Sequence, residues 1–293
     1  MRKGYVDTRL GQLHYATAGQ GRALVLLPQG GRTWPMYAAL AQALAADYQA
    51  IAVDYPGSGG SDPLPAGATF EDIAGSIVDL LDALAIETAC VFGVHTGNKI
   101  AAALAANHPS RVAKVVLAGQ SHSIVPRNDR RAQTVGKTRK KLLHEADLRE
   151  QALVHWADIF NVVSAAWWRE GVMRDITNRA LRTQAMVKAV DEIESADSMP
   201  GLYRANFAFD LQGAYARITV PTLVLEIATP SEDRLIGRQG PAVLEIIRGA
   251  QLATIEEEDY HGITLEDHAD VVAPILRRFL SDGGTDTQSR RTA

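Results

Sequence analysis

This sequence lacks paired cysteines, long apolar runs and an excess of either charge. Its single cysteine, Cys90, stands inside a short apolar stretch. The chain therefore cannot form an internal disulfide, and a lone cysteine in such a place is usually a small core residue. We also find no apolar stretch as long as a signal peptide or a membrane span. These absences favour a reducing compartment, and we expect the protein in the cytoplasm.

The net charge argues against one class of function, and the chain length indicates the domain organisation. Lysine and arginine number 30 against 34 aspartates and glutamates, which gives a formal net charge of −4. Such a balance argues against electrostatic binding of nucleic acid. With 293 residues, of which 46% are hydrophobic, the chain can bury a large core as one α/β domain with an insertion. We expect a small-molecule substrate and no nucleic-acid or membrane partner, and a homodimer stays an option.

The N-terminal part of the chain alternates between strand patterns and helix patterns. Residues 4–19 alternate in polarity around a central glycine, which predicts two antiparallel strands. Continuous apolar runs are typical of strands buried on both faces, and here they occupy 23–29, 49–55, 88–94 and 112–119. Helical spacing separates these runs. The alternation predicts an α/β fold, with a mostly parallel sheet and helices on both of its faces.

The alternation stops after Gly119 and resumes near the C-terminus. Residues 120–217 have an amphipathic helical pattern, and strand patterns return at 221–228 and 250–257 before a last helix over 264–280. We therefore predict a core of 1–119 and 218–280 with an inserted helical lid (cap) at 120–217. An independent helical domain is the alternative. The polar residues 281–293 are expected to form a disordered tail.

Four motifs follow one another along the chain: "VDYPGSGGSDP", which begins at Asp54, "FGVHTGNKIA", "HPSRVAKVVLAG" and "EDYHGITLEDHADVVAPILRRFL". In this order they resemble the motifs of the α/β-hydrolase fold, and the resemblance covers residues 4–280. The first resembles the Asp-x-x-Gly-x-Gly-x-Ser loop of that superfamily, and the second its nucleophile elbow G-x-S-x-G, with His95 at the tip. The third resembles the next loop and strand. The fourth resembles the catalytic-histidine loop and the final helix, with His261 as that histidine.

The elbow also follows from local physics. Gly93 and Gly97 flank a position where the backbone turns sharply, and glycine has no Cβ to clash with the neighbouring strand and helix. The turn places its central side chain at the carboxyl edge of the sheet, where open α/β folds bind ligands. The N–H groups of the helix that starts there favour a developing oxyanion. The resemblance implies an oxyanion hole made of the Gly30 and Thr96 amides.

The sequence departs from the family pattern at the catalytic positions. His95 stands where the nucleophile is expected, and Pro230 stands at the position of the acid that orients the histidine. Glu232 and Asp233 lie close enough in sequence to supply that carboxylate. Of the catalytic residues, His261 alone is unaltered. We therefore expect His95 and His261 to act together in place of a serine-based triad.

Two imidazoles in one lidded pocket permit several reactions. Like charges and desolvation oppose protonating both rings, so one neutral ring can act as base. The pair could activate water against an ester, lactone, amide or activated C–C bond, or His95 could itself be the nucleophile. It could instead move a proton beside a carbonyl, as in a lyase, decarboxylase or isomerase. A pseudoenzyme that only binds its ligand is the remaining alternative.

We expect a cofactor-free enzyme without a metal, because no short metal-ligand spacing such as H-E-x-x-H occurs. Further substrate-binding candidates are polar or aromatic side chains near the pocket or in the lid. They are Gln29, Trp34, His122, Trp156 and Trp167.

Overall fold

The protein was analysed as a computed structural model that describes residues 1–119, 177, 179–195, 198–230, 233, 237–256, 265–266 and 268–281. Its centre is an eight-stranded sheet in the order β1-β2-β4-β3-β5-β6-β7-β8. The pairs β1–β2 and β2–β4 are antiparallel and the other neighbouring pairs are parallel. The strands are β1 Arg2–Thr8, β2 Gly11–Ala18, β3 Arg22–Leu27, β4 Tyr48–Asp54, β5 Ala89–Val94, β6 Val112–Ala118, β7 Thr222–Ala228 and β8 Gln251–Glu256.

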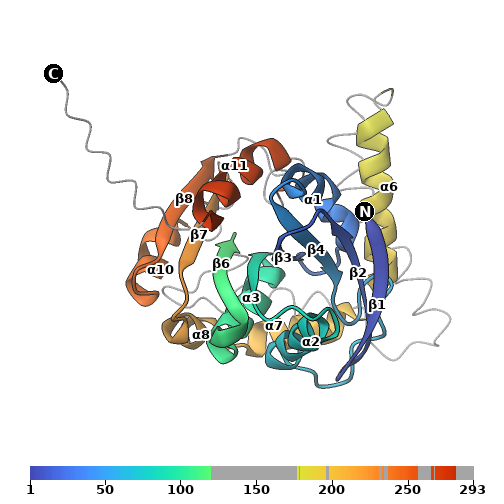
Figure 1. Ribbon diagram of the computed structural model, residues 1–293, viewed down its shortest axis with the longest axis horizontal. Helices are drawn as coiled ribbons and strands as arrows, with labels where there is room; N and C mark the ends of the chain where they lie inside the picture. The colour runs from blue at the N-terminus through green and yellow to red at the C-terminus, as the bar shows by residue number, and fades with distance from the viewer. Residues whose placement is uncertain are drawn as a thin grey trace.

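Helices cover both faces of this sheet. Figure 1 shows α1 and α11 on one side, and α2, α3 and α8 on the other. The helical segments are η1 Trp34–Tyr37, α1 Ala38–Leu44, α2 Phe70–Ala83, α3 Thr96–Asn107, η2 Pro109–Arg111, α6 Arg179–Ser195, α7 Met199–Ala208, α8 Leu211–Arg217, α10 Gly240–Ile246 and α11 Ala269–Leu280. The predicted α/β fold, with a mostly parallel sheet between helices, is confirmed.

The central strands are apolar throughout because each of their faces packs against a helical layer. Side chains alternate between the two faces of a strand. In β3, Val25 and Leu27 belong to the core beneath α2 and α3. Leu24 and Leu26 belong to the core beneath α1 and α11. Both faces of β3 are therefore buried from water. A strand with polar residues at every second position could bury only one face.

The last helix is shorter than the sequence pattern predicts. The pattern starts it at Thr264, whereas α11 begins at Ala269 with His268 as its N-cap. Leu265 has φ +56°, a left-handed conformation that a right-handed helix cannot contain. The side chain of Glu266 is bound to Arg32 in a distant loop. A tertiary contact therefore holds this segment outside the helix.

The predicted lid falls only partly within the described residues. Residues 120–176 lie outside them, while α6, α7 and α8 lie inside. α8 packs against α3 and α10 of the sheet layers. The lid boundaries at 120 and 217 stay a prediction.

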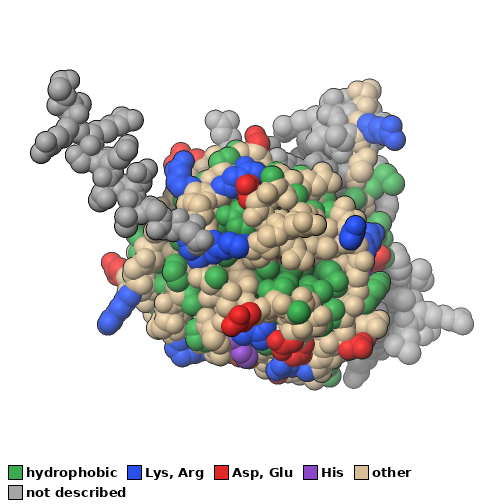
Figure 2. Space-filling model, viewed as in Figure 1, with side chains coloured by type: hydrophobic (Ala, Val, Ile, Leu, Met, Phe, Trp, Pro, Cys, Tyr) green, Lys and Arg blue, Asp and Glu red, His purple; other side chains and the backbone are tan. Residues whose placement is uncertain are grey.

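The surface agrees with the near-neutral composition. On the face drawn in Figure 2, acidic and basic side chains lie interspersed among apolar ones. Each helix among the described residues is too short or too polar to cross a membrane.

The N-terminus of α2 gives a first test of the fold. The Thr69 hydroxyl accepts a bond from the Asp72 amide, and the Asp72 carboxylate accepts one from the Thr69 amide. This is the capping box that the sequence predicts. We expect Thr69→Ala to lower the free energy of unfolding by about 1 kcal/mol, measured by urea denaturation. Thr69→Ser keeps the acceptor oxygen and should stay near wild type, and equal losses in both variants would contradict the capping role.

The same capping box has a defined pH dependence. Hydrogen bonds from Thr69 hold the pKa of Asp72 below its ordinary value. The folded state therefore binds fewer protons here than the unfolded chain does. The contribution of Asp72 to stability is complete at neutral pH and is lost as the pH falls through the lowered pKa. Unfolding curves of wild type and Asp72→Asn should therefore converge in acid, and a constant gap down to low pH would contradict this assignment.

Candidate active site

His95 occupies the turn between β5 and α3. Its φ of +50° and ψ of −104° lie outside the ordinary regions for a residue with a side chain. A residue held in such a sparsely populated backbone region costs about 1–3 kcal/mol. Such strain persists only where the surroundings enforce it, and it is concentrated at functional sites. The His95 side chain is 7% exposed, so the turn presents it to the interior of the molecule.

Two glycines make this turn possible. A Cβ on Gly93 would overlap the main chain of Gly97, and a Cβ on Gly97 would overlap the main-chain carbonyl of Leu27. Strand β5, helix α3 and the end of β3 therefore meet backbone to backbone. This contact fixes the direction in which α3 leaves the sheet, and with it the position of His95.

The imidazole of His95 lies over the ends of β6 and β7. A Cβ on Gly119 would lie 2.9 Å from His95 Cε1 and 3.0 Å from Ile227 Cδ1. The His95 amide donates to the carbonyl of Ala118 at 3.0 Å. A side chain at 119 would therefore displace the ring or Ile227, so the glycine at the end of β6 leaves room for the imidazole in this position.

Asn98 holds the first turn of α3 against the same strand end. Its Nδ2 donates to the carbonyls of Ala118 at 3.2 Å and Gly119 at 3.0 Å. Its Oδ1 accepts a bond from the Tyr215 hydroxyl of α8 at 2.7 Å. Because Asn98 is fully buried, these bonds fix the elbow firmly relative to β6 and α8.

The two oxyanion-hole candidates lie side by side. A Cβ on Gly30 would lie 3.1 Å from the Thr96 hydroxyl oxygen and 3.0 Å from Leu202 Cδ2 of α7. Thr96 is the first residue of α3. The first N–H groups of a helix have no partner within the helix and favour negative charge nearby. The loop after β3, the start of α3 and helix α7 therefore meet at one place beside His95.

Asp54 organises the glycine loop. Its carboxylate accepts bonds from the Trp34 amide at 2.6 Å and the Gly60 amide at 3.2 Å, and it lies 2.8 Å from His14 Nδ1. Burial raises the pKa of Asp54, and these hydrogen bonds partly oppose the rise. A Cβ on Gly59 would overlap this carboxylate. Asp54 therefore links β2, the first residue of η1 and the glycine loop.

Asp233, one of the two acids predicted to orient His261, is paired with an arginine in the described part of the chain. It lies after β7, and its carboxylate forms an ion pair with Arg238 at 2.8 Å. Asp233 and Arg238 line a small cleft together with Gly119, which lies beside the His95 ring, and Ile227, which lies beside Gly119. The other predicted acid, Glu232, lies outside the described residues.

Of the remaining predicted site residues, Gln29 and Trp34 lie in the described part of the chain and the others lie outside it. The carbonyl of Gln29 accepts a bond from the Arg32 amide at 3.2 Å. The Lys3 ammonium of β1 lies 4.8 Å from the centre of the Trp34 ring. The predicted residues outside the described part are His261, His122, Trp156 and Trp167. The described residues contain no group of three or more histidine, cysteine, aspartate or glutamate side chains that could hold a metal ion.

A comparison with protein families identifies the family of the chain. The sequence model of the alpha/beta hydrolase fold family matches residues 22–179. The chain belongs to the α/β-hydrolase family. A proposed carbamate hydrolase, RutD, of Caulobacter vibrioides is 31% identical over 230 residues, 76% of this chain and 79% of that protein. The pyrrolizixenacetamide deacetylase of Xenorhabdus hominickii is 25% identical over 279 residues, 92% of this chain and 94% of the relative.

Solved structures of this fold agree with the assignment. The enol-lactonase of Burkholderia xenovorans LB400 superposes with a TM-score of 0.69 at 22% identity, covering 95% of this chain and 100% of the lactonase. At this sequence identity, the likeness to the lactonase shows that the two proteins share a fold. Together with relatives named as hydrolases, the family match identifies the chain as a hydrolase.

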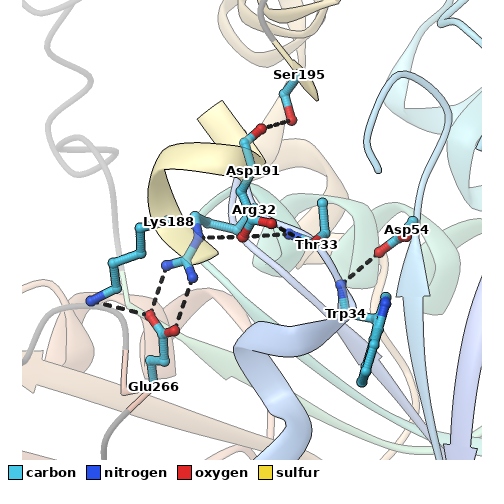
Figure 3. Close-up of polar contacts among 8 residues, drawn as sticks. All are labelled: Arg32, Thr33, Trp34, Asp54, Lys188, Asp191, Ser195 and Glu266. Atoms are coloured by element: carbon cyan, nitrogen blue, oxygen red, sulfur yellow. Dashed lines mark hydrogen bonds and ion pairs between the residues drawn. The ribbon is translucent and has the colours of Figure 1, made fainter. Parts of the chain in front are cut away.

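Sequence reasoning missed the charged residues around the β3 loop of this hydrolase. Arg32 binds Asp191 of α6 and Glu266 before α11, as Figure 3 shows. Near the elbow, Lys99 is also buried and donates to Asn206 of α7 at 2.5 Å. The local signal was an arginine directly after two glycines at the end of a buried strand. Its partners are more than 150 residues away in sequence, where local patterns carry no information about them.

The elbow contact gives a second test. We expect Gly97→Ala to lower the free energy of unfolding by at least about 3 kcal/mol, or to prevent folding, because its Cβ would overlap the Leu27 carbonyl. Gly67→Ala is the matched control. Gly67 has φ +80°, and a Cβ added there would have no neighbouring atom within 4 Å, so this variant should lose about 1 kcal/mol. Similar urea midpoints for the two variants would contradict the close contact.

Proposed function

We propose that the protein hydrolyses an ester, a lactone or an activated C–C bond in a small carbonyl compound with His95 and His261 as an acid–base pair. The observation that carries this proposal is His95 itself. A buried imidazole stands at the strained tip of the elbow, where this family presents its nucleophile. The adjacent Gly30 and Thr96 supply the main-chain amides proposed to bind the oxyanion.

The proposed reaction needs no covalent intermediate. One neutral imidazole removes a proton from water, and the resulting hydroxide adds to the substrate carbonyl. The negative charge that forms on the carbonyl oxygen is held by the two amides. When the tetrahedral intermediate collapses, an imidazolium returns the proton to the leaving oxygen or carbon. Because two nearby imidazoles resist double protonation, one of them stays available as base.

The surroundings of the elbow support a mainly apolar substrate. Leu202 of α7 lies beside Gly30, and Ile227 of β7 lies beside Gly119, the glycine next to the His95 ring. Pockets with apolar walls and few convergent polar groups are typical of small-molecule sites. Relatives named as a carbamate hydrolase, a deacetylase and a 2-hydroxy-6-oxononadienedioate hydrolase are consistent with a carbonyl substrate.

Further roles belong to the same proposal. Glu232 or Asp233 orients His261, and residues 120–217 form a lid over the carboxyl edge of the sheet. Substrate contacts come from residues of the β3 loop and of the lid. These are Gln29, Trp34, His122, Trp156 and Trp167.

A second candidate function is proton abstraction beside a carbonyl without hydrolysis. The absence of a hydroxyl or thiol at the elbow tip favours it, since an imidazole pair and an oxyanion hole can also form and hold an enolate. A lyase, decarboxylase or isomerase would result. A ligand-binding pseudoenzyme would keep the pocket without turnover.

The proposal is tested with p-nitrophenyl esters and small lactones. We expect wild type to turn over, and His95→Ala and His261→Ala each to lose about 100-fold or more in kcat, the range of general acid–base catalysis. His108→Ala is the matched control, because it removes a half-buried imidazole at the other end of α3. A substrate that both alanine variants still turn over at the wild-type rate would contradict the proposal.

A third variant separates the candidate functions. If wild type is inactive on the whole panel while His95→Ser gains esterase activity, the scaffold can hydrolyse esters but His95 serves another reaction or ligand. If ligand affinity survives both alanine variants and no turnover is found, the binding role is favoured.

A further inference from the structure

Arg32 is a fully buried cation held by two carboxylates. Its Nε donates to Asp191 Oδ2 at 2.8 Å, and its two terminal nitrogens donate to the Glu266 oxygens at 2.7 and 2.9 Å. Its side chain is 0% exposed. Burial by itself would lower the pKa of Arg32, but the hydrogen bonds and charges of Glu266 and Asp191 outweigh it and raise the pKa above its ordinary value. The guanidinium is therefore permanently charged and fixed as a planar fork.

The contacts of Arg32 join three distant parts of the chain (Figure 3). Arg32 lies in the loop after β3, Asp191 in α6, and Glu266 in the segment before α11. Lys188 of α6 adds a second cation 3.3 Å from Glu266. We call Arg32, Lys188, Asp191 and Glu266 the buried network. Its two positive and two negative side chains balance one another.

The same network closes the turn that carries Gly30. The Arg32 amide donates to the Gln29 carbonyl at 3.2 Å, which makes residues 29–32 one turn. The next residue, Thr33, is anchored to Asp191 through its amide at 3.3 Å and its hydroxyl at 2.5 Å. The Gly30 amide therefore lies in a turn whose C-terminal end is bonded to α6.

Helix α6 meets this loop through polar residues. The described side chains that it buries include Lys188, Asp191 and Ser195, whereas Met186 and Val190 are exposed. The Ser195 hydroxyl donates to the Asp191 carbonyl at 2.7 Å. An ordinary surface helix turns its apolar side inwards. The buried side chains among the described residues of α6 make directional hydrogen bonds and ion pairs, which fix geometry more narrowly than apolar packing does.

Stability alone does not account for such a network. Well-packed apolar residues at the same positions are often as stabilising as a buried ion pair, or more so, because desolvation offsets the attraction. Charged groups with fixed hydrogen-bond geometry instead restrict the segments that they join to a single arrangement. The arrangement fixed here is that of the Gly30 turn relative to α6 and to the segment that follows the predicted catalytic His261.

We propose that Arg32 is a positioning residue, which holds the Gly30 turn and the Glu266 segment in the geometry that the reaction at His95 requires. The inference rests on the proposed function, since it assigns the Gly30 amide to the oxyanion. Arg32 acts through the turn and does not itself touch the substrate. Losing its fork should therefore affect the transition state more than substrate binding.

The test compares wild type with Arg32→Lys, which keeps the charge but loses the fork. Glu266→Gln serves as a second variant if Arg32→Lys does not fold. The control is Arg9→Lys. Arg9 binds Asp79 through Nε at 2.8 Å and Nη2 at 2.7 Å, but on the exposed surface between the β1–β2 turn and α2. For each protein we would measure kcat and KM on an ester and on its thionoester, the urea midpoint, and hydrogen exchange of the intact chain.

For the network variants we expect kcat on the ester to fall by about 10- to 100-fold with KM nearly unchanged, as for displacement of a catalytic group by about 1 Å. The ester-to-thionoester rate ratio should also fall, because sulfur is the weaker hydrogen-bond acceptor and reports on the oxyanion donors. Exchange should rise in peptides covering 29–33 and 265–266. Arg9→Lys should change none of these.

Two results would overturn the proposal. The network would be merely structural if its variants lower the urea midpoint but keep the wild-type kcat and thionoester ratio. Arg32 would not hold the turn if exchange in 29–33 is the same in wild type and Arg32→Lys. This second readout needs no turnover, so it still decides the question if wild type proves inactive and the proposed function fails.

Discussion

The site depends on one steric constraint, the backbone contact of β5, α3 and β3 at the elbow. Gly93 meets the main chain of Gly97, and Gly97 meets the carbonyl of Leu27. With no Cβ in either place, α3 can start close to the sheet. The strained φ of His95 and the contact between Thr96 and Gly30 both follow from that approach. Any group wide enough to separate these backbones would also separate the residues proposed to bind the oxyanion.

Buried polar side chains then set what surrounds the elbow. Asn98 is bonded to the end of β6 and to Tyr215, and Asp54 to the first residue of η1 and to the glycine loop. Arg32 is bonded to α6 and to the Glu266 segment. Each of them links segments that lie far apart in sequence. The apolar core could form with these loops in several arrangements, since apolar packing has little directional preference. The hydrogen-bonded groups select one arrangement, at the cost of desolvating each of them.

The sequence predicted those features that depend on neighbours along the chain. Continuous apolar runs predicted the central strands, and Thr69 with Asp72 predicted the start of α2, because these signals are complete within a few residues. The helical pattern predicts the start of α11 too early, because Leu265 has a left-handed backbone and Glu266 is bound to Arg32, a contact that no local pattern contains. The family match confirms the resemblance on which the fold was first proposed. The roles of individual site residues remain proposals.

The direction of the His95 ring bears on the choice between nucleophile and base. A serine at this tip would end its side chain at a hydroxyl just beyond the turn, close to the start of α3. The imidazole is longer and lies against Gly119 and near Ile227, over the ends of β6 and β7. The Gly30–Thr96 contact lies on the other side of the elbow, beneath Leu202 of α7. If the proposed oxyanion hole binds the substrate carbonyl, the ring and the carbonyl would lie on opposite sides of the elbow, and an intervening water would join them. Under that proposal His95 would act as a base, not as the nucleophile.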